Sequence, residues 1–439
     1  MGVLNPYPNR DPYDREIWAL AWPALGALAA DPLVSLVDTA FVGQLGATPL
    51  GALGVNASIF SFTFWLFAFL AYATTPMIAR AMSKGQPDIA GVLINHALSL
   101  ALLSGFISLI LLQLAANPLI DLMGAQGELA EATLSYYRIR ACSAPAVLVI
   151  MAGHGIFRGF QDTRTPFYVT LGLNLINLVL DPIFIFVLHW GLTGAAWATL
   201  IAQWLGAVVF IWLFLIKYRK TLNVPLTWPA FSALKPFLKI GSELVIRTMA
   251  LAGTLLVATG VATRLGTVSI AAHQVALQLW LFLALVIDAL AIASQALMAK
   301  YIGLGQNVIA RHIASRLLWL GLWLGLILMG GFLISRGPLA NLFSNDLEVL
   351  SQVGEIFIFV AVMQPLNALI FVWDGIFMGR EDFRFLAISM VIAAAIAVTM
   401  LRLVIPFGWG LTGVWWSMIV LMLLRFTTLW WRYNTDKRF

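Results

Sequence analysis

The sequence is short of charge, because only 10% of its 439 residues are Asp, Glu, Lys or Arg while 61% are hydrophobic. Soluble globular domains carry about 25% charged residues. So few polar side chains cannot cover the surface of a chain of this size in water. The composition therefore excludes soluble enzymes, nucleic-acid-binding modules and disordered scaffolds, and it predicts an integral membrane protein.

Other absences narrow the chemistry. The chain has a single cysteine, Cys142, so no intramolecular disulfide is expected. The motifs G-x-x-x-x-G-K-[ST] and H-E-x-x-H are missing, and we therefore expect neither an ATPase nor a membrane metalloprotease. Since no other catalytic constellation is visible, we predict a protein that is not an enzyme and that needs no cofactor.

Long apolar runs are what the sequence has in abundance. A helix needs about 20 apolar residues to cross a bilayer core of about 30 Å. Twelve stretches are long enough, and they predict an all-α polytopic membrane protein. The stretches are 17–42, 49–79, 90–116, 129–156, 166–188, 191–216, 237–263, 267–299, 312–335, 350–379, 385–406 and 410–431.

The basic residues are distributed unevenly between the connections. If the amino terminus is cytoplasmic, the two tails and the even-numbered connections hold 19 of the 26 Lys and Arg residues. The opposite connections hold only Arg264 and Arg336. Lys and Arg concentrate on the cytoplasmic side of membrane proteins, so we expect both termini in the cytoplasm. A bacterial inner membrane is the expected location.

Short motifs recur about 220 residues apart. The dipeptide GQ at 85–86 returns at 305–306, and the pentapeptide WGLTG at 190–194 returns at 409–413. Several matches at one offset predict a duplicated six-helix unit. Because six is an even number, the two copies enter the membrane in the same direction and form a parallel repeat.

The repeat suggests how the chain divides. We expect an amino-terminal lobe at 1–216, a cytoplasmic linker at 217–236 and a carboxy-terminal lobe at 237–439. Two such lobes suit a transporter in which a central site opens alternately to each side of the membrane. A duplicated membrane scaffold or half of a channel is the alternative.

Acidic residues deep in the apolar stretches are candidates for function, because ionisable groups inside a membrane are costly. Three fall in each half. They are Asp31, Asp38, Asp181, Glu243, Asp288 and Asp374.

The first-half acids occur together with amides on shared helix faces. Asp31 and Asp38 are seven residues apart, and Asn174, Asn177 and Asp181 follow a spacing of three and four, so each set lies on one face. Paired carboxylates beside an amide favour proton binding, and they also suit a small hard cation such as Na⁺ at Asp38 and Asp181. Hydrogen-bonded packing between helices is the alternative.

A hydroxyl is available nearby, since Thr199 on the sixth stretch can add an oxygen to this group. Two further residues are weaker candidates. Pro23 predicts a bend in the first stretch, although prolines are also ordinary in membrane helices. His154 is either a packed, hydrogen-bonded residue or part of a proton relay.

The second-half acids do not repeat those of the first half. The positions 220 residues before Glu243, Asp288 and Asp374 are not acidic. This asymmetry predicts ion coupling in one lobe and attraction of cations in the other. Arg247, four residues after Glu243, is a candidate partner for it, whereas Asp288 and Asp374 have no such local partner.

The sequence resembles the multidrug and toxic compound extrusion (MATE) family, in particular its DinF-like branch. The similarity covers the whole chain. The segments that carry it are Val37–Gly43 followed by Leu45-Gly46, Phe157–Thr163, Asn177 with Leu180–Pro182, and Asp374–Gly379.

The resemblance implies a cation-coupled antiporter that expels organic, often cationic and amphiphilic compounds with a proton or sodium gradient. It also implies that Asp38, Asn177, Asp181 and Thr199 form an amino-lobe cation site. Glu243 and Asp374 fall where other branches place carboxy-lobe acids. His154 stands where relatives can carry an asparagine, which favours protons over sodium.

We therefore predict a proton- or sodium-driven multidrug efflux antiporter. Its expected partners are small drug-like compounds and membrane lipids, with no nucleic acid, and we expect a monomer. The alternative is an exporter or flippase of a specific metabolite or lipid-linked intermediate. The excess of buried acids favours cations, whereas Arg138, Arg140 and Arg247 keep the alternative open.

Overall fold

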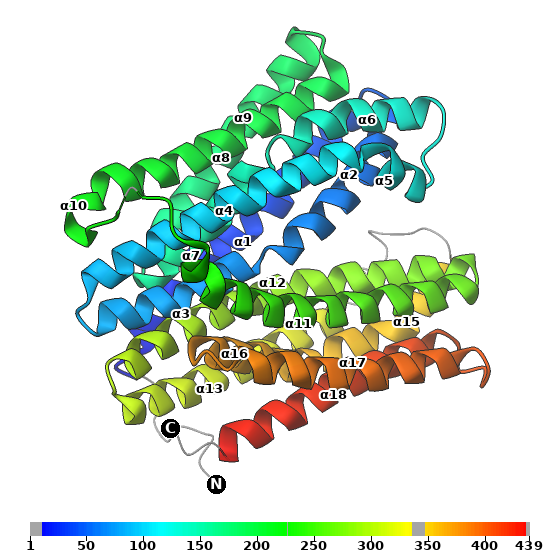
Figure 1. Cartoon of the computed structure of the whole chain (residues 1–439). Coiled ribbons are helices and arrows are strands. Elements are labelled where there is room, and N and C mark those ends of the chain that lie inside the picture. Colours follow the sequence, from blue (N-terminus) through cyan, green and yellow to red (C-terminus); the bar gives the residue numbers. More distant parts are fainter. Residues whose placement is uncertain (1–10, 226, 336–346, 436–439) are drawn as a thin grey trace. The chain divides into compact units, whose positions relative to one another are not determined.

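The chain is helical throughout its described part. The structure, a computed structural model, describes residues 11–225, 227–335 and 347–435, and these contain no strand (Figure 1). Ten helices in this part are long and apolar enough to cross a membrane, and two bent pairs of shorter helices reach that length together. The predicted fold of twelve membrane-spanning helices is thus confirmed.

The helices alternate with short turns. The first half contains α1 (Asp14–Gly43), α2 (Ala47–Leu66), α3 (Phe69–Ser83), α4 (Pro87–Leu114), α5 (Ala116–Leu122), α6 (Glu128–Ala141), α7 (Ala144–Gly159), α8 (Arg164–Pro182), α9 (Gly191–Trp212) and α10 (Arg219–Leu222). The second half contains α11 (Phe231–Arg264), α12 (Thr267–Gly303), α13 (Asn307–Ile334), α15 (Leu347–Val362), α16 (Gln364–Gly379), α17 (Phe383–Val404) and α18 (Gly410–Thr435).

Two spans are broken at corresponding places in the repeat. The pair α6–α7 bends by 50° and the pair α15–α16 by 45°. Pro145 and Pro365 begin the second helix of each pair, because the first helical turn has no use for the N–H that proline lacks. By contrast, α1 continues as one helix through Pro23 and Pro32, so the prolines of the first span do not break it.

Helix α8 changes its hydrogen-bonding pattern at its end. Pro182 follows Asp181 directly, and a π-helical turn continues from it at Ile183–Val187. Since proline cannot donate to the carbonyl group four residues earlier, the ladder of an α-helix is interrupted here. Such π turns within helices often occur at functional sites.

The chain forms two compact units whose boundaries fall inside helices. One unit is Trp22–Gly241, and the other combines Met1–Ala21 with Ser242–Phe439. Helix α1 therefore begins in one unit and continues in the other, and α11 does the same in the opposite sense. The two crossing points are 220 residues apart, which is the spacing of the sequence repeat. This division differs from the expected lobes at 1–216 and 237–439 by the exchanged starts of these helices.

Ion pairs hold the start of α1 in its unit. Arg316 of α13 donates hydrogen bonds of 2.8 and 2.7 Å to the two carboxylate oxygens of Asp14. Glu16 accepts a hydrogen bond of 2.8 Å from Tyr301 and contacts Lys300, both of α12. Two-point contacts between a guanidinium and a carboxylate fix orientation as well as position, so the first turn of α1 is bound firmly to α12 and α13.

Apolar contacts hold the start of α11 in the other unit. Leu234 and Phe237 are buried, and a methyl group built on Gly241 would lie 2.9 Å from the ring of Phe69. The helix can approach this ring only because residue 241 has no side chain. The two exchanged starts thus use different chemistry, ionic for α1 and apolar for α11.

Close helix packing in the second half can be tested at Gly375. A methyl group there would lie 2.2 Å from the carbonyl oxygen of Ala291 in α12. Since a backbone carbonyl cannot move aside, we expect Gly375→Ala to lower the free energy of unfolding by about 1–3 kcal/mol. Gly253→Ala in α11 is the matched control, because its methyl group would meet nothing within 4 Å. Equal unfolding midpoints of both variants in one detergent would contradict this packing.

Candidate functional site

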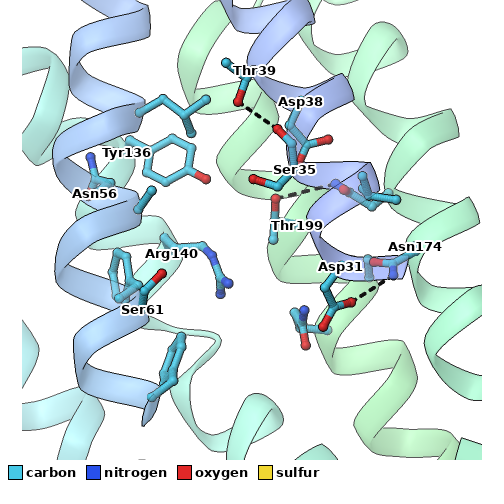
Figure 2. A pocket seen from close by; sticks show the side chains of 18 of the residues that line it. Asp31, Ser35, Asp38, Thr39, Asn56, Ser61, Tyr136, Arg140, Asn174 and Thr199 are labelled. Atoms are coloured by element: carbon cyan, nitrogen blue, oxygen red, sulfur yellow. Dashed lines mark hydrogen bonds between the residues drawn. The ribbon is translucent and has the colours of Figure 1, made fainter. Parts of the chain in front are cut away.

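A pocket of about 430 Å³ lies within the unit Trp22–Gly241 (Figure 2). Helices α1, α2, α6, α8 and α9 line it. Binding sites for small organic molecules occupy about 300–1,000 Å³ and combine apolar walls with a few polar groups. The pocket has the size and composition of such a site.

The acids of α1 line one wall of this pocket. Asp31 and Asp38 both face it, as their spacing of seven residues predicts. Asp31 accepts a hydrogen bond of 2.9 Å from Nδ2 of Asn174 on α8 (Figure 2). Asp38 is less exposed, and its Oδ1 atom is buried without a hydrogen-bond partner. The expected grouping of these residues is present in the structure.

A second carboxyl lies behind the pocket wall. Asp181 is fully buried, and its side chain adjoins that of Asp38. Oδ1 of Asp181 accepts a hydrogen bond of 3.3 Å from Nδ2 of Asn177, while its Oδ2 atom has no partner. Two neighbouring carboxyls thus each keep one buried oxygen free. Buried polar atoms of this kind are rare and call for an explanation.

An amide and a hydroxyl complete this group. Nδ2 of Asn177 also lies 3.4 Å from Oγ1 of Thr199. The Thr199 hydroxyl donates to the carbonyl oxygen of Ala195 at 3.0 Å, so its oxygen remains free to accept. Oxygen atoms of the two acids and of Thr199 are the groups that could hold a hard cation here. The described residues contain no group of three or more His, Cys, Asp or Glu side chains that could hold a metal.

A base lies in the same pocket, which the sequence did not indicate. Arg140 of α6 is half-buried there, with its guanidinium 5.5 Å from the ring centre of Phe60 and 5.6 Å from that of Phe64. It also donates a hydrogen bond to Ser143. The buried Tyr136, one turn before Arg140, directs its hydroxyl into the same region (Figure 2). The spacing of four between them was the only available signal.

His154 lies outside the lining of the pocket, but polar contacts lead towards it. Its Nε2 atom is 3.2 Å from the hydroxyl of Thr170 on α8. Thr170 lies one turn before Asn174, which in turn binds Asp31. The histidine is thus hydrogen-bonded, as one of the two sequence interpretations expected. Pro23 is on α1, and it does not line the pocket either.

The expectation that Asp374 lacks a partner is wrong. Its Oδ2 atom accepts a hydrogen bond of 2.6 Å from Arg247 of α11 and another from Arg425 of α18. These partners are 127 and 51 residues away in sequence, so local spacing could not reveal them. Two guanidinium groups on one carboxylate leave it little capacity to attract a further cation.

The other second-half acids are placed differently. Arg247 pairs with Asp374 rather than with Glu243, so the local pair suggested by their spacing does not form. The charge of Asp288 acts on Arg425, which places this acid near the same cluster. None of these three acids lines the pocket formed by α1, α2, α6, α8 and α9.

Comparison with known proteins gives a consistent result. The MatE family model matches residues 23–183 and again residues 244–404. The two matched stretches have equal length, which supports the duplication inferred from the recurring motifs. Together they cover most of the chain.

Individual relatives cover nearly the whole sequence. Protein DETOXIFICATION 44, chloroplastic, of Arabidopsis thaliana is 37% identical over 98% of this chain and 84% of its own length. DNA damage-inducible protein F of Escherichia coli (strain K12) is 29% identical over 94% and 90%. The solved structure "Crystal structure of MATE in the bent conformation" has a TM-score of 0.89 at 23% identity and covers 97% of this chain and 96% of that one. This last similarity concerns the fold.

Proposed function

Since the chain belongs to the MatE family, whose members are integral membrane transporters and not enzymes, we propose that it is a secondary active antiporter. It exports small organic compounds in exchange for protons. The observation that carries this proposal is the pair Asp38 and Asp181, two adjoining carboxyls that each keep one buried oxygen without a partner. The pair lies directly beside a pocket of about 430 Å³.

Protonation of this pair supplies the coupling. Two ionised carboxyls in contact repel each other strongly where little water screens them. A proton bound between them removes that repulsion and satisfies a free oxygen on each side. Helix α1, which carries Asp38, can then approach α8, which carries Asp181. Closure of this kind narrows the pocket and expels its contents.

The hydrogen bonds around the pair support protons over sodium as the coupling ion. Asn177 directs its amide nitrogen, a donor, towards both Asp181 and Thr199. A sodium ion between these groups would require oxygen ligands, so the amide would have to turn round. A proton requires no such rearrangement.

Helix α1 also supplies the link that alternating access needs. It lines the pocket in one unit, and it begins in the other unit, where Arg316 holds Asp14. A movement of α1 at the pocket is therefore transmitted along one continuous helix to the second unit. Parallel-repeat transporters work by such movement of one half against the other.

The exported compounds are organic and amphiphilic. Asp31 and Asp38 attract a positive group, and Phe60 and Phe64 offer aromatic surface. Both termini face the cytoplasm in this proposal, because 19 of the 26 Lys and Arg residues then lie on that side. We place the protein in a bacterial plasma membrane on the same ground. Arg140 favours the second candidate, an exporter or flippase of a specific metabolite or lipid-linked intermediate.

Transport into proteoliposomes with separately imposed gradients tests this function. With an acidic lumen and equal sodium on both sides, protons leave and we expect uptake of a fluorescent organic cation. A protonophore should abolish this uptake, and liposomes without protein should show none. A sodium gradient at equal pH should drive no uptake. Uptake driven by sodium alone would contradict proton coupling, and uptake under neither gradient would contradict antiport.

A further inference from the structure

The pocket carries opposite charges on opposite walls. Asp31 and Asp38 lie on α1, whereas the guanidinium of Arg140 extends from α6. Figure 2 shows Arg140 and Asp31 facing each other from the two sides of the pocket. The aromatic rings of Phe60 and Phe64 lie beside the guanidinium. A ligand in this pocket therefore meets a cation at one end and carboxyl groups at the other.

These charges do not neutralise each other by direct contact. Within the described part of the chain, Arg140 forms no ion pair with any acid. The charges of Asp31 and Asp38 nevertheless act on it through space. The second half of the chain behaves differently, since Asp374 contacts two arginines there. The gap between Arg140 and the acids is therefore a feature of this pocket.

Each charge is held in place on its own side. Arg140 is bound to Ser143 and lies against two aromatic rings, an arrangement that guanidinium groups favour. Asp31 is held by Asn174 at 2.9 Å. Groups fixed before a ligand arrives need not be ordered on binding, which strengthens binding of a ligand that matches them.

We propose that this pocket selects zwitterions, namely amphiphilic molecules that carry one positive amine and one carboxylate on an aromatic body. The amine lies against Asp31 and Asp38, and the carboxylate binds the planar fork of Arg140, which suits two parallel hydrogen bonds. Phe60 and Phe64 contact the aromatic body. This proposal names the substrate class of the antiporter and rests on that function.

The same molecule without its negative charge fits less well. A simple cation leaves Arg140 facing it with a like charge and no counterion. A simple anion meets two acids at the other end of the pocket. A purely structural role for Arg140 predicts something else, because its loss would then weaken all ligands equally or destabilise the fold.

The test compares two dyes that differ only in charge. A rhodamine with a free carboxyl group is a zwitterion, and its methyl ester is a cation of nearly equal shape. Fluorescence polarisation of each dye with the purified protein in lipid nanodiscs measures affinity without any gradient. The wild-type protein should bind the zwitterion more tightly. Arg140→Gln should weaken zwitterion binding about tenfold, as expected for loss of one charge-assisted pair, and leave the ester unchanged or bound more tightly.

Two further variants keep the test specific. Arg138→Gln removes an exposed arginine of the same helix that does not line the pocket, and it should change neither affinity. Arg140→Lys retains the charge but not the planar fork, and it should fall between the wild type and Arg140→Gln. Unchanged unfolding midpoints show that the variants are folded.

Three outcomes would overturn the proposal: equal weakening of both dyes by Arg140→Gln, the same selectivity change in Arg138→Gln, or a wild-type preference for the ester. These outcomes are distinct from failure of the antiport function. Selective binding without gradient-driven uptake contradicts antiport alone. Proton-driven uptake of the ester in preference to the zwitterion contradicts the selectivity alone.

Discussion

Asp38→Asn should abolish proton-coupled export. The variant keeps the size and shape of the side chain, but an amide cannot take up and release a proton. Since Asp38 adjoins Asp181 beside the pocket, the variant can no longer exchange a proton at this pair. We expect drug-dependent proton movement to fall at least about 100-fold, the lower end of the effect usual for loss of a proton-transferring group.

A pH-sensitive dye in the lumen of proteoliposomes measures this movement when substrate is added outside. The matched control is Asp121→Asn, which changes an exposed acid of the short helix α5 in the same unit and should leave transport intact. Asp181→Asn should fail as Asp38→Asn does, because the two carboxyls act as one site. Full antiport in Asp38→Asn would rule out the mechanism.

Asp374→Ala should destabilise the protein by about 3–5 kcal/mol. The change leaves Arg247 and Arg425 without the carboxylate that both contact. Arg425 is almost completely buried, with 2% exposed, and removing one partner of a buried ion pair leaves an uncompensated charge of high energy. Asp288 acts on Arg425 from nearby, and it offsets only part of this cost.

Denaturant unfolding in a fixed detergent measures the loss. A matched triple variant, Asp374→Leu with Arg247→Met and Arg425→Met, should recover most of the stability, because apolar side chains of similar volume often replace buried ion pairs without cost. Glu243→Ala is the control for loss of an acid that forms no ion pair with the described residues. A midpoint of Asp374→Ala equal to that of the wild type would show that the cluster does not hold α11, α16 and α18 together.

The two clusters of buried charge show why part of the site was predictable. Asp31 and Asp38 recur at one helical period, and so do Asn177 and Asp181, so each set had to share a face. Scarcity of charge made these residues conspicuous in an apolar chain. Their grouping around one pocket follows from the pattern once the helices pack.

Arg140 and Asp374 show what the pattern could not reveal. Arg140 was visible only as a base in an apolar stretch, and its position opposite Asp31 depends on how α6 packs beside α1. Asp374 was expected to be without a partner, yet it binds arginines 127 and 51 residues away. Contacts at such separations leave no local signature in one sequence.

The sequence by itself determined that this is a membrane protein of twelve spans in two related halves, since apolar length and periodicity follow directly from the order of residues. It also determined which acids share a helix face. Only the tertiary structure decided which charges meet, that α1 and α11 exchange their starts between the two units, and that a base faces the acids across the pocket. The reason is physical: periodicity along a helix is local, whereas the partner of a buried charge is chosen by the packing of distant helices.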